Sequence, residues 1–460
     1  MNKDFLWGAS SSSFQAEGMW QKAGQGASVI ELDQANNIES FKKGVDFYHR
    51  FPEDIEYMKK AGLKAFRFSI SWPRIFPEGS GQPNIEGINY YQKIIKQLRE
   101  AKIEPIVTIY HFDYPLTLVK RYGGWISKKS IGDYLSYCHY LFEQLGNQVK
   151  YWITINEQDH VIKIPTRLGI KSDSFAKHMQ ECYQANHNMS VASALAIKLC
   201  HEMIPDAKIG PALSYQPYYP ASNQLSDKKA AQYADLLTQK YLLDLQCKGF
   251  YSQEFKNYLQ WKNVNLDIKA NELDEIKQNH PDFIGINYYS SNIVQYLPPE
   301  NKYGQIEGHP VPKKEFGLYE IKNDPRLDTT KWGWSIDPKG LKIALKNIYS
   351  QYHLPLLITE NGFGDQDHLV NGNINDQDRV NYLKAHINQM LDAIKQNIPV
   401  LGYCIWSFTD VISGHNGSNK RYGLIYVDQN MDRIPKKSFM FYQALIKQME
   451  GVNSNENNSY

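Results

Sequence analysis

Eight short apolar stretches recur along the whole chain, and they constrain its fold more than any other feature. They begin near residues 5, 63, 104, 151, 208, 282, 355 and 400. The stretch Leu354–Gly362 is an apolar run bounded by Pro and Gly, which predicts a strand buried on both faces, as in a parallel sheet. The stretch at 63–72 alternates, with Phe66 and Phe68 on one face and Arg67 on the other. We therefore expect eight strands.

Between these stretches, apolar residues recur at helical spacing, as in Tyr91, Ile94 and Leu98. In the first such region we expect Pro52 at the start of the helix and Gly62 at its end. Eight alternating strand and helix units predict an α/β fold, a single (β/α)8 TIM barrel with extended loops after its strands.

Two polar regions flank or interrupt this pattern. Residues 297–333 are rich in Pro, Gly and Lys, which predicts one long surface excursion. No internal repeat or linker divides the rest of the chain. We therefore expect one barrel domain over residues 1–450 and a polar, disordered tail over residues 451–460.

The charge balance and the cysteines argue against several classes of partner. A net charge of +2, without long basic runs, disfavours a nucleic-acid surface. The N-terminal residues lack the pattern of a signal peptide, and no apolar run approaches membrane-spanning length. The five cysteines are scattered without a CxxC spacing, so neither a disulfide framework nor a zinc site is expected. We expect a cytoplasmic protein that acts on a small molecule, with no cofactor, no membrane partner and no nucleic-acid partner. The sequence leaves the oligomeric state open.

Polar side chains follow the predicted strands where the strands end, and in a barrel these ends share one mouth. They are Gln15, Arg67, His111, Asn156, Glu157, Tyr289, Glu360 and Trp406. Two carboxylates facing one pocket suit glycoside hydrolysis, in which one donates a proton and the other attacks or stabilises the developing cation. Arg67 is the candidate for keeping one of them anionic. Metal chemistry fits less well because only His111 is a typical transition-metal ligand. Taken alone, Glu360 also fits a turn cap or the partner of a structural arginine.

Seven short motifs, in order over nearly the whole chain, resemble those of the glycoside hydrolase family 1 β-glycosidases. They are Phe5–Gly8 with Gln15–Gly18, Phe66–Trp72, His111–Asp113, Gly123–Trp125, Thr154–Glu157, Gly285–Tyr289 and Ile358–Gly362. The resemblance implies a retaining mechanism, with carboxyl groups about 5–5.5 Å apart. Glu360 would be the nucleophile, and Glu157 would act first as acid and then as base. Arg67 and Tyr289 would orient Glu360.

The same resemblance implies contacts to the sugar. Gln15, His111 and Asn156 would hold hydroxyl groups. Trp406 would stack beneath the ring, and Trp334 would line the leaving-group side.

Two departures from the family pattern concern the leaving-group subsite. The family usually has Pro after the acid/base residue, and this chain has Gln158. The segment 159–174 also lacks the glycine- and proline-bearing pattern that the family leads one to expect. Neither departure touches the two carboxylates.

The segment after the last strand differs from that of ordinary family members, which carry a Phe-Glu-Trp triplet whose Glu binds sugar hydroxyls. Ser413 stands at the Glu position and Gly414 at the Trp position, with Lys420 and Tyr422 following. This resembles the 6-phospho-β-glycosidase branch, in which Ser, Lys and Tyr at this spacing grip the 6-phosphate. A glutamate would repel a phosphate, whereas a serine offers a donor and a lysine a positive charge. The plain alternative is that Lys420 belongs to a solvated basic loop end.

These patterns lead to one expected function, a retaining 6-phospho-β-glucosidase whose substrate is a phosphorylated β-glycoside. Gly414 favours glucose, because phospho-galactosidases of the branch usually place a Trp there. Such a substrate is not found outside the cell, which agrees with a cytoplasmic location. Three alternatives stay open: a non-phosphorylated β-glucosidase, a 6-phospho-β-galactosidase, and, outside enzymes, an inactive sugar-binding barrel.

Overall fold

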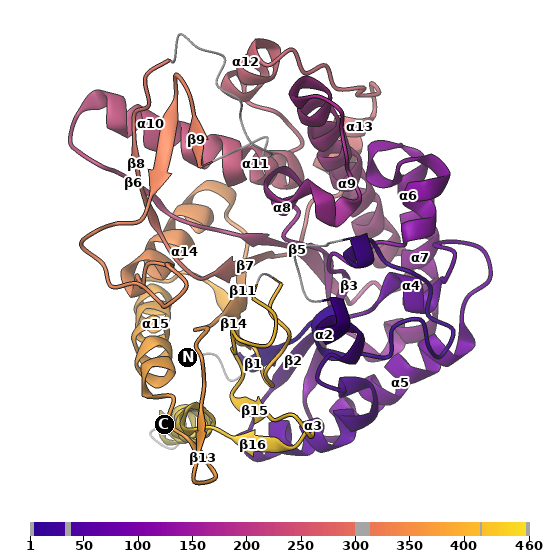
Figure 1. Ribbon diagram of the computed structural model, residues 1–460, viewed down its shortest axis with the longest axis vertical. Helices are drawn as coiled ribbons and strands as arrows, with labels where there is room; N and C mark the ends of the chain where they lie inside the picture. Colours follow the sequence, from indigo (N-terminus) through magenta and orange to yellow (C-terminus); the bar gives the residue numbers. More distant parts are fainter. Residues whose placement is uncertain (1–3, 33–37, 300–312, 415, 457–460) are drawn as a thin grey trace.

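Eight parallel strands form a closed barrel at the centre of the computed structural model, which describes residues 4–32, 38–299, 313–414 and 416–456 (Figure 1). The barrel strands are β1 (Leu6–Ser10), β2 (Ala65–Ser69), β3 (Glu104–Tyr110), β4 (Tyr151–Asn156), β5 (Lys208–Ser214), β7 (Ile284–Tyr288), β11 (Leu356–Asn361) and β14 (Val400–Trp406). Each neighbours the barrel strands before and after it in the chain, and β14 closes onto β1. The predicted (β/α)8 barrel is confirmed, and every strand begins within two residues of its predicted start.

Helices surround the barrel and cover its outer face (Figure 1). The longer ones are α3 (Phe47–Ala61), α5 (Ile85–Glu100), α7 (Lys129–Leu145), α9 (Phe175–Met203), α10 (Leu225–Asp235), α11 (Tyr241–Lys248), α12 (Gln253–Trp261), α14 (Pro338–Tyr352), α15 (Gln377–Lys395) and α16 (Lys437–Glu456). Shorter ones are α1 (Ser13–Ala16), α2 (Ile38–Lys43), α4 (Trp72–Ile75), α6 (Leu116–Tyr122), α8 (His160–Lys163) and α13 (Glu272–Gln278). Within the described ranges, no helix combines the length and apolar character needed to cross a bilayer.

The lower part of the barrel interior is filled by apolar side chains that its strands contribute. This layer consists of Leu6, Ala65, Ile106, Ile153, Ala212, Phe283, Leu357 and Cys404, all buried. Such layers make a barrel interior a packed core rather than a pore. The polar side chains of the following strand positions therefore lie above a closed apolar floor, at the C-terminal end of the barrel.

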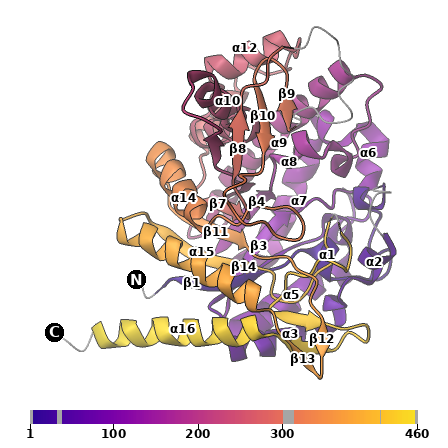
Figure 2. The same cartoon turned by 60° about the vertical axis from the view of Figure 1, so that its left-hand side comes forward.

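Several loops carry strands of their own. A four-stranded sheet, in the order β6 (Tyr218–Pro220), β8 (Asn292–Gln295), β10 (Tyr319–Lys322) and β9 (Lys314–Glu315), is drawn at the top of Figure 2. Two small hairpins follow later strands: β12 (Leu369–Val370) pairs with β13 (Asn373–Ile374), and β15 (Ile425–Val427) pairs with β16 (Arg433–Pro435). The segment 407–424, between β14 and β15, carries Ser413, Lys420 and Tyr422.

Three local predictions differ from the structure. Helix α3 begins at Phe47, so Pro52 lies inside it rather than at its start, while Gly62 caps its end with a φ of +79° as predicted. The excursion at 297–333 is not one irregular loop, because β9 and β10 pair there; residues 300–312 lie outside the described ranges. Helix α16 runs to Glu456, so residues 451–456 of the predicted disordered tail are helical, and residues 457–460 lie outside the described ranges.

Candidate active site

A cavity of about 160 Å³ opens among the side chains at the C-terminal end of the barrel strands. Nine of the twelve residues predicted for the site line it: Gln15, His111, Glu157, Tyr289, Trp334, Glu360, Trp406, Ser413 and Tyr422. The other three lie directly behind this lining and contact it. Arg67 pairs with Glu360, Asn156 contacts His111, and Lys420 lies against Trp334. The structure therefore brings all twelve residues together.

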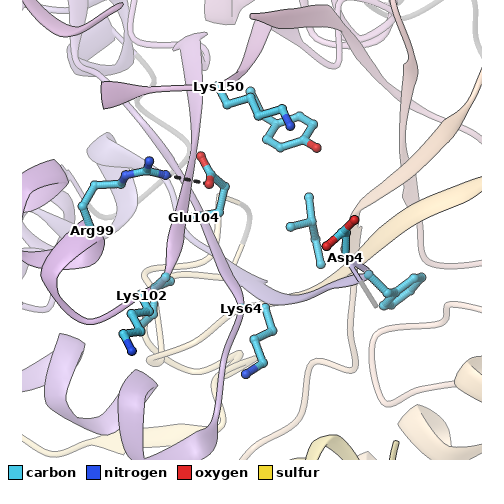
Figure 3. A pocket seen from close by; sticks show the side chains of 10 residues that line it. Asp4, Lys64, Arg99, Lys102, Glu104 and Lys150 are labelled. Atoms are coloured by element: carbon cyan, nitrogen blue, oxygen red, sulfur yellow. Dashed lines mark hydrogen bonds and ion pairs between the residues drawn. The ribbon is translucent and has the colours of Figure 1, made fainter. Parts of the chain in front are cut away.

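A larger hollow of about 470 Å³ lies at the opposite end of the barrel, and it holds none of the predicted residues. Its lining includes Leu6, Glu104 and Tyr151, which begin three of the barrel strands. Figure 3 shows its charged side chains spread apart, with the Arg99–Glu104 pair joined at 2.6 Å. Chemistry in barrel proteins is done at the other end, where the strands finish, so the smaller cavity is the candidate active site.

Glu360 is held by two donors, one for each carboxylate oxygen. The buried guanidinium of Arg67 forms an ion pair with Oε1, and the Tyr289 hydroxyl donates to Oε2 at 2.6 Å. Arg67 is itself fixed, because its Nη2 donates to Asn156 Oδ1 at 2.7 Å and its Nε donates to Thr108 Oγ1 at 2.8 Å. Residues from several strands thus fix the orientation of one carboxylate.

The backbone at the end of β11 explains how Glu360 reaches this position. A bulge between Ile358 and Glu360 shifts the register against β7, so that Glu360 lies opposite Asn287. Beyond the strand, Gly362 passes the end of β14 so closely that a Cβ there would lie 1.9 Å from the Trp406 carbonyl oxygen. Only glycine permits this approach. The predicted apolar strand and the glycine after it therefore place Glu360 and Trp406 side by side.

Glu157 lies just beyond the end of β4, in a left-handed backbone conformation with a φ of +47°. Its Oε1 accepts a hydrogen bond from Asn287 Nδ2 at 3.0 Å. Its Oε2 lies 2.8 Å from Nδ1 of His160, at the start of α8. A non-glycine residue with positive φ is uncommon and is often found at functional sites. The conformation directs Glu157 toward the same cavity as Glu360.

Burial and neighbouring charges shift the pKa values of the two carboxyl groups in opposite directions. Burial raises the pKa of Glu360 to about 7, and the charge of Glu157 adds to this, although Arg67 and Tyr289 act to lower it. Burial also acts to raise the pKa of Glu157, but His160 and Asn287 outweigh it and lower that pKa. Arg67 was predicted to keep one carboxylate anionic; it lowers the pKa of Glu360 without overcoming burial. Two buried carboxyl groups in one cavity titrate as a pair.

An amide network fixes the sugar-binding candidates on one side of the cavity. Asn156 Oδ1 accepts from Arg67 and from Asn287, so its Nδ2 must donate to His111 Nε2, 3.1 Å away. Burial lowers the pKa of His111 well below its ordinary value, which keeps the ring neutral. Because Nε2 accepts, the ring proton lies on Nδ1. Gln15 is equally fixed, since Oε1 accepts from Ser12 and Nε2 donates to the Ile412 carbonyl, both at 2.7 Å.

Lys420 is buried among aromatic rings on the other side of the cavity. The residue is 2% exposed, and its Nζ lies 3.4 Å from the ring centroid of Trp334 and 5.2 Å from that of Tyr422. No carboxylate of the described residues lies within ion-pair distance of it. Desolvation consequently lowers the pKa of Lys420 to about 7. The alternative interpretation, that Lys420 belongs to a solvated loop end, is therefore wrong.

Ser413 and Tyr422 lie beside this lysine in the cavity lining. Burial raises the pKa of the Tyr422 hydroxyl, although a hydrogen bond from Ser413 acts to lower it. Two hydroxyl groups and one ammonium group, all within the segment after β14, can therefore meet one anionic ligand.

Among the lining residues that the sequence did not predict, His160 and Arg167 are the ones that can carry a positive charge. Both come from the segment 159–174, which was noted only for its departure from the family pattern. His160 follows Glu157 by three residues. This spacing brings two side chains together on a helical turn, but the sequence pattern did not predict a helix there. No pattern in the sequence pointed to Arg167, whose position depends on the short 3-10 turn Pro165–Leu168.

Comparison with known proteins gives a consistent picture. The model of glycosyl hydrolase family 1 matches residues 1–451. The chain is 39% identical to the aryl-phospho-beta-D-glucosidase BglC of Bacillus subtilis, over 97% of each chain. It is 37% identical to a 6-phospho-beta-glucosidase of Clostridium longisporum, over 96% of each. Among solved structures, a family 1 b-glucosidase from Thermotoga maritima superposes with a TM-score of 0.87 at 33% identity, covering 97% of this chain and 98% of the other.

The burial of Lys420 yields a prediction about stability. Its pKa is lower in the folded protein than the ordinary value of 10.5, so the unfolded chain binds this proton more tightly. The lysine therefore destabilises the fold most below pH 7, and the penalty disappears as the pH rises toward 10.5. We expect Lys420→Met to raise the free energy of unfolding by on the order of 2 kcal/mol at pH 6 and by less at pH 10.

Urea unfolding at the two pH values measures this difference, with Lys171→Met, an exposed lysine, as the matched control. Equal effects of Lys420→Met at both pH values would contradict the account of a desolvated ammonium group.

Proposed function

The chain belongs to glycosyl hydrolase family 1, and from this premise we propose that it is a retaining 6-phospho-β-glucosidase. The observation that carries the proposal is the buried Lys420, which has no carboxylate partner among the described residues. It lies directly behind the cavity wall to which Ser413 and Tyr422 belong. A buried ammonium group is costly unless it meets an anion. A phosphate on the sugar would supply that anion.

The proposed chemistry is a double displacement. Glu360 attacks the anomeric carbon to form a covalent glycosyl-enzyme while Glu157 gives a proton to the departing oxygen, and Glu157 then activates the water that releases the sugar. Arg67 and Tyr289 orient Glu360 through the contacts described above. Both carboxyl groups open on one cavity, which supports these roles.

The first step needs Glu360 ionised and Glu157 protonated, the reverse of what burial and His160 favour. We propose that Glu157 and His160 hold the catalytic proton together, since Oε2 and Nδ1 are 2.8 Å apart. His160 then supplies the proton that the carboxyl group alone would lose.

The sugar would lie between the two walls of the cavity. Gln15, His111 and Asn156 would hold its hydroxyl groups, and Trp406, whose ring lies 20° from the plane of His111, would stack beneath it. Trp334 lies between Tyr289 and Lys420, with its ring centroid 5.4 Å from that of Tyr289.

The leaving group would occupy an adjoining hollow of about 320 Å³. This hollow shares His160 and Trp334 with the main cavity and extends along Tyr218 and Ile321. Its aromatic and apolar members suit an aryl or sugar aglycone. It also explains how a chain with Gln158 in place of the usual Pro keeps a leaving-group site: Gln158 points away, donating to Asn186 and Ser190.

Gly414 supports glucose rather than galactose as the phosphorylated sugar, because phospho-galactosidases of the branch usually have a Trp at this position. A cytoplasmic location is part of the same proposal, because sugar phosphates are made and retained inside cells.

Hydrolysis of 4-nitrophenyl β-D-glucoside 6-phosphate, compared with the unphosphorylated compound, tests the proposal. We expect a strong preference in kcat/KM for the phosphorylated glucoside, with the 6-phospho-galactoside weaker. Lys420→Met should raise KM for the phosphorylated compound by about ten- to a hundredfold, the loss of one charge-assisted contact. A higher kcat/KM for the unphosphorylated glucoside would contradict the proposal.

Glu360→Gln tests the nucleophile. The amide keeps the shape of the side chain but cannot attack, so kcat should fall by about four orders of magnitude or more, measured with the phosphorylated aryl glucoside. Glu272→Gln is the matched control, because Glu272 is also buried but pairs with Lys128 away from the cavity. Hydrolysis that survives Glu360→Gln would refute the assignment.

His160→Gln tests the shared proton. Without the imidazole, the carboxyl group of Glu157 has to hold the catalytic proton alone. The alkaline limb of the kcat/KM profile should therefore move to lower pH by about one unit or more. His111 and Glu360 also face Glu157 and are unchanged in this variant. His201→Gln, which removes an imidazole paired with Asp282 on the surface, should leave the profile in place. An unmoved alkaline limb in His160→Gln would argue against the shared proton.

A further inference from the structure

The charge of a sugar phosphate exceeds what Lys420 can balance. A phosphomonoester carries about −1.5 to −2 charges at pH 7. Lys420 supplies at most one positive charge, and burial lowers its pKa to about 7. Glu157 and Glu360, which line the same cavity, add negative charge. A second cation beside the phosphate would strengthen the selection of the dianion.

Arg167 is a buried cation in the lining of this cavity. Its side chain comes from the 3-10 turn Pro165–Leu168, and the residue is 7% exposed. The guanidinium carbon lies 5.1 Å from the ring centroid of Phe112, and Nη2 donates to the Gly414 carbonyl at 3.2 Å. The arginine therefore reaches from the loop after β4 to the segment after β14, beside Ser413.

Gly414 makes room for this guanidinium. A Cβ at position 414 would lie 2.6 Å from Nη2 of Arg167, closer than side-chain carbons approach other atoms. With any side chain there, the end of the arginine side chain would have to shift. The glycine at position 414 therefore leaves the space that the guanidinium of Arg167 occupies.

The positive charge of Arg167 reaches the proposed phosphate contacts. Burial raises the pKa of the Tyr422 hydroxyl, and Arg167 is among the groups that act to lower it. Arg167 likewise acts with burial to lower the pKa of His111. Lys420 faces Tyr422 from the side of Trp334, so the two cations approach the Ser413–Tyr422 pair from different loops.

We propose that Arg167 is a second cation for the 6-phosphate and that, together with Lys420, it determines the preference for phosphorylated substrates. The inference rests on the proposed function. Guanidinium groups match phosphate oxygens in pairs, and their charge does not titrate in the physiological range. Arg167 therefore holds a constant charge where Lys420 is only partly protonated before the ligand enters.

Arg167→Met tests the inference, with Lys171→Met, an exposed lysine four residues along, as the matched control. KM and kcat are measured for 4-nitrophenyl β-D-glucoside and its 6-phosphate, and inorganic phosphate is titrated as a competitive inhibitor. We expect KM for the phosphorylated compound and the inhibition constant of phosphate to rise by about ten- to a hundredfold. The preference for the phosphorylated compound should fall accordingly, and Lys171→Met should change none of these values.

Gly414→Ala is the second variant, and it keeps the arginine. Its methyl group would shift the tip of the guanidinium away from its place beside Ser413, so the preference for the phosphorylated compound should fall here too, but by less than in Arg167→Met. A circular dichroism spectrum and a melting curve confirm that each variant folds.

The outcomes separate this inference from the proposed function. If the wild-type protein prefers the unphosphorylated glucoside, the proposed function fails and the inference fails with it. If the wild type prefers the phosphorylated compound but Arg167→Met weakens both substrates equally, or neither, the inference alone is overturned. In that case, Arg167 only supports the Gly414 carbonyl.

Discussion

The buried ion pair between Arg67 and Glu360 joins the parts of the barrel on which the site depends. Arg67 comes from β2 and Glu360 from β11, and further contacts tie the arginine to Thr108 of β3 and Asn156 of β4. Burying two such charges is costly unless every donor and acceptor is satisfied, and losing one partner costs roughly 3–5 kcal/mol. The barrel meets this condition by closing, which brings four strands to one point. The orientation of Glu360 is therefore a property of the closed barrel rather than of its own loop.

The sequence pattern predicted the barrel well because barrel strands and helices carry strong local signals. Short apolar or alternating stretches predicted each strand start to within two residues, and the residues at strand ends line the cavity or lie directly behind its lining. The features that were not predicted lie in segments where the local sequence pattern is weak. The pairing of β10 with β8 and the position of Arg167 depend on contacts with segments distant in the sequence, and His160 lies on a short helix that no apolar pattern marked. Helix α3 starts before Pro52 although a proline beyond the first turn removes a backbone hydrogen bond, and the burial of Phe47 and Phe51 offsets that loss.

The proposed chemistry and the proposed selectivity are carried by different kinds of structure. The carboxyl groups and their partners lie at strand ends, held by hydrogen bonds between strands. Lys420, Ser413, Tyr422 and Arg167 lie on loops, where a residue can change without disturbing the barrel. The buried Lys420 illustrates the cost in folding stability of the proposed selectivity, because its ammonium group lies in an environment that disfavours its charge. A residue that lowers stability in this way is expected where function requires it.

The apolar layer inside the barrel has a kinetic consequence. Leu6, Ile153, Leu357 and their neighbours close the barrel beneath the carboxyl groups, so nothing passes through its axis. In a double displacement the leaving group must therefore depart, and water must arrive, through the same mouth. The aglycone leaves first. The anomeric carbon of the glycosyl-enzyme then faces the space that the aglycone occupied. Any alcohol that enters this space competes with water for the sugar, so the same architecture that hydrolyses a glycoside also allows it to transfer the sugar to a new acceptor.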